Sequence, residues 1–224
     1  MIDTTAPTAV LFGLTYILRT KRYALVMEYS PLGTMEQQPL ATTWKDVMEQ
    51  AFRISANLDK MHRAGVVHGD LHPANIVFSS QRPMIVGVGL SRAVTDRRAV
   101  AYRPPEAVEG ADGTKAADVY CLGTLLWQMV TGVPPRRETK CGDSIPGAAP
   151  EYNDIIQRCW DKDPSARPSA EDVAGFTSFW LYRCKHKDDE SPFLPETRAF
   201  VAERRAVHLE QSEADGFGSL TSRL

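Results

Sequence analysis

The chain has 224 residues, of which 43% are hydrophobic, and its formal net charge is −2. These values are typical of one large folded domain, alone or with a tail, and they predict no nucleic-acid partner. No apolar run reaches the roughly 18 residues that would span a membrane. The N-terminus shows no secretory signal, and the four cysteines are scattered, so we expect reduced thiols and a cytoplasmic location.

Two apolar, β-rich runs come first in the chain. Residues 10–16 and 23–29 flank the polar turn Thr20-Lys21-Arg22, so a hairpin is the simplest assignment. The segment 30–34, which contains a proline and a glycine, then ends the second strand.

A helix is predicted after this hairpin. Thr43 fits its N-cap, and Gly65 marks its end. Apolar residues between them recur at spacings of three and four, which indicates a core face and not a site. They are Val47, Ala51, Ile54, Leu58 and Met61.

The segment 68–75, His-Gly-Asp-Leu-His-Pro-Ala-Asn, places an acid and an amide five residues apart between short apolar runs. In phosphoryl transfer, such an Asp accepts the proton of the attacking hydroxyl and such an Asn holds a metal on the phosphates. A polar turn between two strands is the alternative interpretation. The segment resembles the catalytic loop of protein kinases, and also the His-Gly-Asp loop of aminoglycoside and choline phosphotransferases, because Gly69 replaces the usual kinase Arg.

Three later blocks resemble protein kinases and not the small-molecule phosphotransferases. Residues 101–106, Ala-Tyr-Arg-Pro-Pro-Glu, are similar to the Ala-Pro-Glu end of an activation segment. Residues 116–132 are apolar on nearly every face and contain Asp118, which matches the Asp that ties down the catalytic loop in that family. Residues 159–169 match a Cys-Trp…Asp-Pro…Arg-Pro segment, in which Arg167 is expected to pair with Glu106. The resemblance covers residues 10–185.

The resemblance also implies a nucleotide site. Met27 stands at the gatekeeper position, and the backbone of Glu28 and Ser30 is expected to meet an adenine edge. Val77 is expected to complete the adenine platform. ATP and Mg²⁺ are the cofactors that this family implies.

The expected catalytic residues are His68, Asp70 and Asn75, but the metal site departs from the family pattern. Gly87-Val88-Gly89 aligns with the Asp-Phe-Gly triplet, and a glycine offers no oxygen to a hard cation. Asn75 is therefore the only metal ligand left. We expect ATP and Mg²⁺ to bind weakly or not at all.

Regulation by phosphorylation is also expected to be lost. With Gly69 in place of Arg, a phosphorylated activation segment has no receiver. Thr95 and Tyr102 are the obvious hydroxyls near the end of that segment. Residues 135–152 leave little room for the docking helix that the family has there.

The sequence therefore predicts an α+β protein-kinase-like fold. It comprises an N-lobe remnant with a β hairpin and a hinge (1–34), a mainly α-helical C-lobe (35–185), and a charged tail, partly helical or disordered (186–224). The Gly-rich loop, strand Lys and helix Glu of the family precede its fourth strand, and only nine residues precede Val10.

We therefore expect a truncated pseudokinase that acts by binding a protein. The alternative is an active ATP-dependent serine/threonine or tyrosine kinase whose N-lobe is missing from this gene model. The hypothesis of a small-molecule phosphotransferase depends on the His-Gly-Asp run alone. The presence of Glu106, Asp118 and Arg167 disfavours it.

Overall fold

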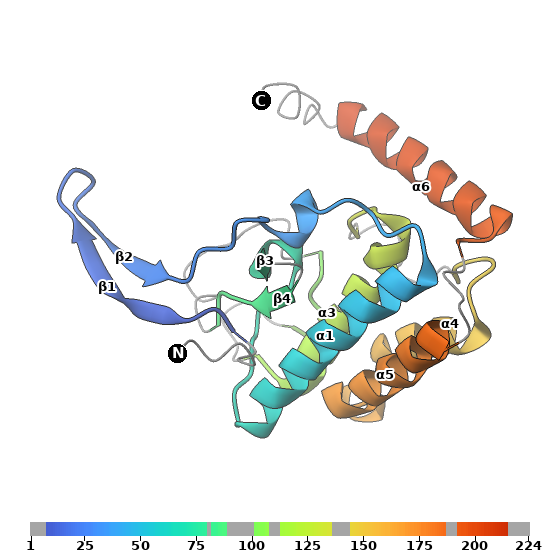
Figure 1. Cartoon of the computed structure of the whole chain (residues 1–224), viewed down its shortest axis with the longest axis horizontal. Helices are drawn as coiled ribbons and strands as arrows, with labels where there is room; N and C mark the ends of the chain where they lie inside the picture. Colours follow the sequence, from blue (N-terminus) through green and yellow to red (C-terminus); the bar gives the residue numbers. More distant parts are fainter. Residues whose placement is uncertain are drawn as a thin grey trace.

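The computed structural model describes residues 8–79, 82–88, 101–107, 113–135, 144–186 and 192–214. Within these residues the chain forms two separate antiparallel hairpins and a group of packed helices (Figure 1). The elements are β1 (Leu11–Ile17), β2 (Arg22–Met27), α1 (Trp44–Arg63), β3 (Ile76–Ser79), β4 (Arg82–Ile85), α3 (Lys115–Thr131), α4 (Pro150–Cys159), α5 (Ala170–His186) and α6 (Pro195–Ala214).

Helix α1 lies at the centre of the packing and contacts α5, β4 and α3. The side chain of Thr43 caps its first turn by accepting a hydrogen bond from the N–H of Asp46 at 3.2 Å. The residues of its predicted apolar stripe are all at most 3% exposed. Burial of this face, more than helix propensity, therefore stabilises α1 in the fold.

Helix α3 is buried along most of its length. Thr114 caps its start by accepting from the N–H of Ala117 at 3.0 Å, and Gly132 ends it with a φ of 67°. Leu122, Leu125 and Leu126 are completely inaccessible to solvent. Helix α3 thus provides the fixed support against which the loops of the site are held.

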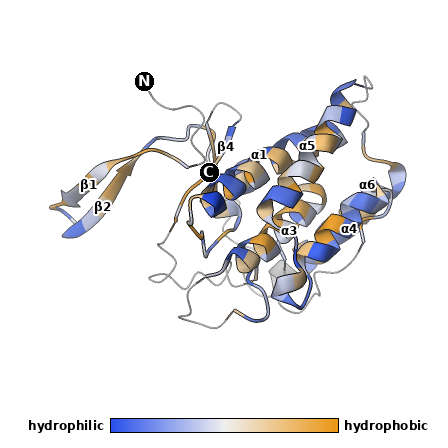
Figure 2. Ribbon diagram, turned by 90° about the horizontal axis from the view of Figure 1, so that it is seen from below, coloured by the Kyte–Doolittle hydropathy of each residue, from blue (hydrophilic) through white to orange (hydrophobic). Residues whose placement is uncertain are grey.

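The β1–β2 hairpin stands clear of the helices in Figure 1 and Figure 2. Its strands pair with each other from Leu11↔Met27 to Ile17↔Arg22, with an irregularity between Leu11 and Gly13. Apolar side chains on both faces are exposed, among them Leu14 at 65% and Tyr23 at 73%. A lone two-stranded hairpin is marginally stable in water.

The chain beyond residue 185 also contributes to the core. Phe193 is 6% exposed, and its ring centroid lies 5.0 Å from that of Trp44. Thr197 is inaccessible and donates to the carbonyl of Pro146 at 2.7 Å. The first turns of α6, within the segment expected to be a charged and partly helical tail, therefore pack against the helical body. Residues 187–191 and 215–224 of that tail lie outside the described residues.

The predicted α+β, helix-rich fold is confirmed. None of the helices in the described ranges is both long and apolar enough to cross a bilayer.

Candidate active site

Asp118 fixes the backbone of the 68–75 loop. Its carboxylate accepts hydrogen bonds from the N–H groups of His68 and Gly69, each at 2.8 Å, and the residue is only 1% exposed. His62 at the end of α1 donates a third bond through Nε2 at 2.9 Å. A buried carboxylate requires such a full set of donors, and here they join α1, α3 and the loop.

His62 was not identified from the sequence. It follows Leu58 by four residues and so lies on the buried face of α1, where an ionisable side chain needs a partner. That position was the available signal. Because a carboxylate only accepts hydrogen bonds, the contact with Asp118 assigns the proton to Nε2 of His62.

Gly69 adopts a conformation that other residues rarely take. Its φ is 79°, and a Cβ atom on Gly113 would lie only 2.7 Å from its Cα. Where protein kinases usually carry Arg, this chain has a left-handed backbone and a close contact between two glycine backbones.

Asp70 is mostly buried although it lies in a loop. Its side chain is 14% exposed, its Oδ1 lies 3.2 Å from Nη2 of Arg103, and its Oδ2 lies 3.7 Å from Nε2 of His72. Burial opposes ionisation of Asp70, but the His72 imidazole and the Arg103 guanidinium outweigh it and lower the pKa of the carboxyl. The expected base is therefore held as an ion-paired carboxylate.

Asn75 stabilises the turn that follows Asp70. Its Nδ2 donates to the carbonyl of Asp70 at 2.9 Å and lies 3.0 Å from Nε2 of His72. The backbone carbonyl of Asn75 accepts a hydrogen bond from the N–H of Val86 at 2.9 Å. The side chain expected to hold a metal is thus hydrogen-bonded to the loop that carries it.

The position of the expected metal-binding Asp cannot supply a ligand. Gly87 has a φ of 83°, and a Cβ atom there would lie 2.7 Å from Oδ1 of Asn75. No group of three or more His, Cys, Asp or Glu side chains in the described residues is arranged to hold a metal. Gly87 therefore adds no side-chain oxygen to that of Asn75 at this position. Gly89 of the triplet lies outside the described residues.

His68 is a buried, neutral part of this loop. Its Nε2 donates to the carbonyl of Val86 at 2.8 Å, and its Nδ1 accepts from the N–H of Asp70 at 3.1 Å. Burial lowers the pKa of His68, and this effect exceeds the opposing contributions of the Val86 carbonyl and nearby carboxylates. The side chain therefore holds the loop shape and does not carry a charge at neutral pH.

The expected hinge residues lie between the hairpin and the body. Met27 ends β2, and the N–H of Glu28 donates to the carbonyl of Val10 at 2.8 Å. The hydroxyl of Ser30 is buried and has no hydrogen-bond partner. Val77 in β3 bridges to Thr34, so the segment after the hinge is attached to the β3–β4 hairpin. The structure thus places these residues where the β1–β2 hairpin joins the rest of the protein.

Glu106 and Arg167 form a bidentate ion pair, at 2.6 and 2.9 Å. The side chain of Arg167 is inaccessible to solvent, whereas that of Glu106 is 35% exposed. Arg167 also donates to the carbonyls of Ala116 and Asp161. Burial opposes ionisation of Glu106, but the guanidinium outweighs it and lowers the pKa of the carboxyl. This pair ties the segment 101–107 to the helices.

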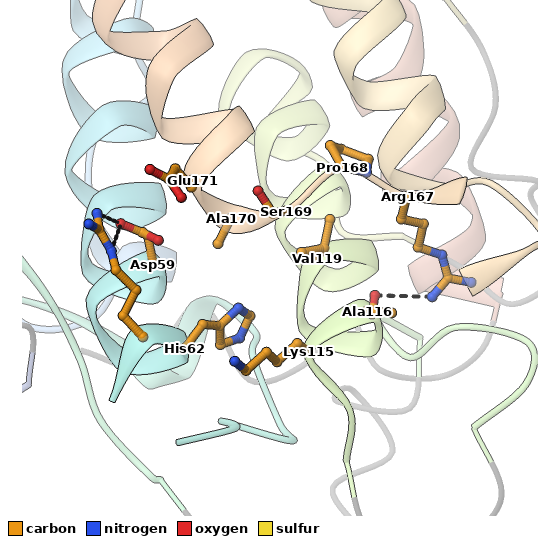
Figure 3. A pocket seen from close by; sticks show the side chains of 11 residues that line it. Asp59, His62, Lys115, Ala116, Val119, Arg167, Pro168, Ser169, Ala170 and Glu171 are labelled. Carbon is orange, nitrogen blue, oxygen red and sulfur yellow. Dashed lines mark hydrogen bonds and ion pairs between the residues drawn. The ribbon is translucent and has the colours of Figure 1, made fainter. Parts of the chain in front are cut away.

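A cavity of about 350 Å³ lies beside His62 and Arg167 (Figure 3). It is bounded by the end of α1, the first turns of α3 and the residues that lead into α5. His62 and Arg167 both line it, as the close-up shows. The residue that supports the 68–75 loop from α1 and the residue that holds the segment 101–107 therefore line the same cavity.

Tyr102 does not offer its hydroxyl to solvent. It is 4% exposed, and its hydroxyl donates to Oε1 of Gln128 at 2.5 Å. The other candidate, Thr95, and the basic residues Arg97 and Arg98 lie outside the described residues.

The helical body, the anchored loop and the Glu106–Arg167 pair define a protein kinase domain. Residues 9–177 match the family model of the protein kinase domain, so the chain belongs to this family. It is 32% identical over 190 residues to Aurora/IPL1-related protein kinase 2 of Caenorhabditis elegans. The aligned region covers 75% of this chain and 61% of that relative. It is 33% identical over 146 residues to serine/threonine-protein kinase PkaA of Streptomyces coelicolor, which covers 54% of this chain and 27% of the relative.

The name of a plant relative includes tyrosine as well as serine and threonine. The chain is 25% identical over 177 residues to serine/threonine/tyrosine-protein kinase HT1 of Arabidopsis thaliana, which covers 67% of this chain and 45% of the relative. The chain therefore spans less than two thirds of each of these three relatives. These comparisons confirm the predicted family.

Proposed function

We propose that this protein kinase domain is a pseudokinase, catalytically dead or severely impaired, that acts by binding another protein. The observation that carries the proposal is the geometry at Gly87, where the family Asp is absent and the Asn75 amide fills the adjacent space. Removing one strong electrostatic contributor typically costs ~10²–10³ in rate. ATP and Mg²⁺ are therefore expected to bind weakly or not at all.

The β1–β2 hairpin supports the protein-binding part of the proposal. Its exposed apolar side chains, including Leu11 and Phe12 at 57% and 60%, form a surface of the kind that marks interaction sites. We further propose residues 1–34 as the N-lobe part with the hinge, 35–185 as the C-lobe and 186–224 as a tail. The free thiols Cys121, Cys159 and Cys184 support a cytoplasmic location.

An active serine/threonine or tyrosine kinase is the second candidate. Asp70 and Asn75 are both present, and Asp118 holds the loop that carries them. The relatives named above, at about a third identity, are kinases by name.

Transfer of radiolabelled phosphate from Mg-ATP to general protein substrates distinguishes the two candidates. The pseudokinase proposal predicts no incorporation above that of the Asp70→Asn variant. A thermal melt with millimolar Mg-ATP provides the second measurement, since a ligand at a hundred times its Kd stabilises a native state by ~2.7 kcal/mol. No shift is expected. Incorporation that Asp70→Asn abolishes would establish the active kinase instead, and a shift that needs Mg²⁺ would contradict the expected loss of the metal site.

A further inference from the structure

The segment that contains Arg103 is fixed on both of its sides. Before it, the hydroxyl of Tyr102 donates to Gln128, and the thiol of Cys121 donates to the Tyr102 carbonyl at 3.2 Å. After it, Glu106 is held by its partly buried ion pair with Arg167. Arg103 is therefore anchored beside the 68–75 loop by neighbours that belong to α3 and to the helical body.

Each carboxylate oxygen of Asp70 has a basic side chain of the same chain beside it, and the one at Oδ1 is hydrogen-bonded. Nη2 of Arg103 lies 3.2 Å from Oδ1, and the His72 imidazole lies 3.7 Å from Oδ2. A hydroxyl that transfers its proton to a base must approach to about 2.6–3.2 Å. A substrate hydroxyl that takes the place of the guanidinium at Oδ1 would therefore have to displace Arg103 before Asp70 could accept its proton there.

We infer that Arg103 fills the position at Asp70 that a substrate hydroxyl would need, and that Asp70 serves this chain as the counter-ion of Arg103. The pair then acts as a latch between the segment 101–107 and the loop 68–75. That Asp70 is no catalytic base rests on the proposed function, but the contact between Asp70 and Arg103 does not depend on it. It gives Asp70 a role that does not require phosphate transfer.

The environment of Arg103 makes this role costly to lose. Its side chain is 25% exposed, and its Nε is buried without a partner. Asp70 supplies the hydrogen-bond acceptor identified for this guanidinium. Removing the carboxylate would leave a largely buried cation without compensation, whereas removing both groups together would leave neither charge unpaired.

Hydrogen exchange on the full chain tests the latch in a double-mutant cycle. The proteins are the wild type, Asp70→Asn, Arg103→Gln and the double variant, with Arg103→Lys as the variant that keeps the charge. Each single substitution is expected to speed exchange of the segment on the opposite side by about three- to thirtyfold. The double variant is expected to exchange no faster than the more affected single variant, and Arg103→Lys to fall between it and the wild type.

Two outcomes would overturn the latch. One is unchanged exchange in both segments, and the other is strictly additive effects in the double variant. Should Arg103→Gln fail to fold, Arg103→Lys and Asp70→Asn still report on the opposite segments, and unchanged exchange in both would again refute the pair.

Phosphate transfer measured on the same proteins separates the latch from the proposed function. If Arg103→Gln gains transfer that Asp70→Asn in that background removes, the latch stands and the pseudokinase proposal fails. If none of the proteins transfers phosphate and the exchange effects are non-additive, the latch and the pseudokinase proposal both stand. If the cycle shows no coupling, the latch fails whatever the activity.

Discussion

Gly87 and Asn75 share the space that a metal-binding side chain would need. A Cβ atom on Gly87 would lie 2.7 Å from Oδ1 and 2.9 Å from Cγ of Asn75, and the Gly87 backbone has a φ of 83°. Restoring an Asp at position 87 therefore requires Asn75 to move. It also requires a left-handed backbone, which costs an ordinary residue roughly 1–2 kcal/mol.

The first prediction is that Gly87→Asp lowers stability and does not restore phosphate transfer. Gly65→Asp is the matched control, because its φ is 76° but no atom lies within 4 Å of its Cβ position. Denaturant titration should show a larger loss for Gly87→Asp than for Gly65→Asp. Equal losses would mean that Asn75 moves aside freely, and incorporation of label would mean that a single carboxylate restores the site.

The second prediction concerns the Glu106–Arg167 pair. Arg167→Ala is expected to lower the free energy of unfolding by about 3–5 kcal/mol, because it removes one partner of a pair in which the guanidinium is inaccessible. Arg158→Ala is the control, since its contact with Asp154 is 4.0 Å long and both side chains are more than half exposed. Such a pair contributes about 0–1 kcal/mol. Similar losses for the two variants would contradict a stabilising role for the Glu106–Arg167 pair.

The third prediction is a pH dependence that comes from His68. Because burial lowers its pKa in the folded state, the unfolded chain takes up the proton first as the pH falls below about 6.5. Stability should therefore decrease as the pH is lowered from 7 to 5, with this group contributing at most ~1.4 kcal/mol per pH unit. His68→Gln should reduce that slope, measured by urea titration at several pH values. His186→Gln, at an exposed site, should leave it unchanged.

The fourth prediction is rapid exchange in the first hairpin. Strands β1 and β2 pair only with each other among the described residues, and most of their side chains are exposed. Amides of residues 11–27 should exchange orders of magnitude faster than those of the buried face of α1. Their exchange should slow when a partner is bound. Strong protection of this hairpin in a proven monomer would contradict the prediction.

The local features of the fold could be predicted from the sequence, because their causes are local. Thr43 precedes a stripe of apolar residues at helical spacing, and the structure begins α1 directly after it. The same helix ends at Arg63, two residues before the Gly65 that was expected to mark its end. The arrangement of Asp118 and of Glu106 with Arg167 depended on a family resemblance, because no spacing rule brings residues so far apart together.

The remaining features depend on tertiary contacts that no local pattern encodes. Arg103 beside Asp70 is an example, because a lone Arg in a polar segment usually faces water. The burial of Phe193 and Thr197 is another, since both follow a charged segment that is typical of a tail. In each case the partner lies more than 30 residues away in the chain.

The turn of the first hairpin also makes it a preferred site for proteases. Arg19, Lys21 and Arg22 are all exposed, and Lys21 has a φ of 53° at the end of a hairpin that stands away from the body. Trypsin should therefore cut there before it reaches the helices. The released strand β1 would then be held only by its pairing with β2 and by contacts such as the bridge between Thr8 and Ile85, so the time for which the two fragments remain together after the cut would measure how firmly β1 is held.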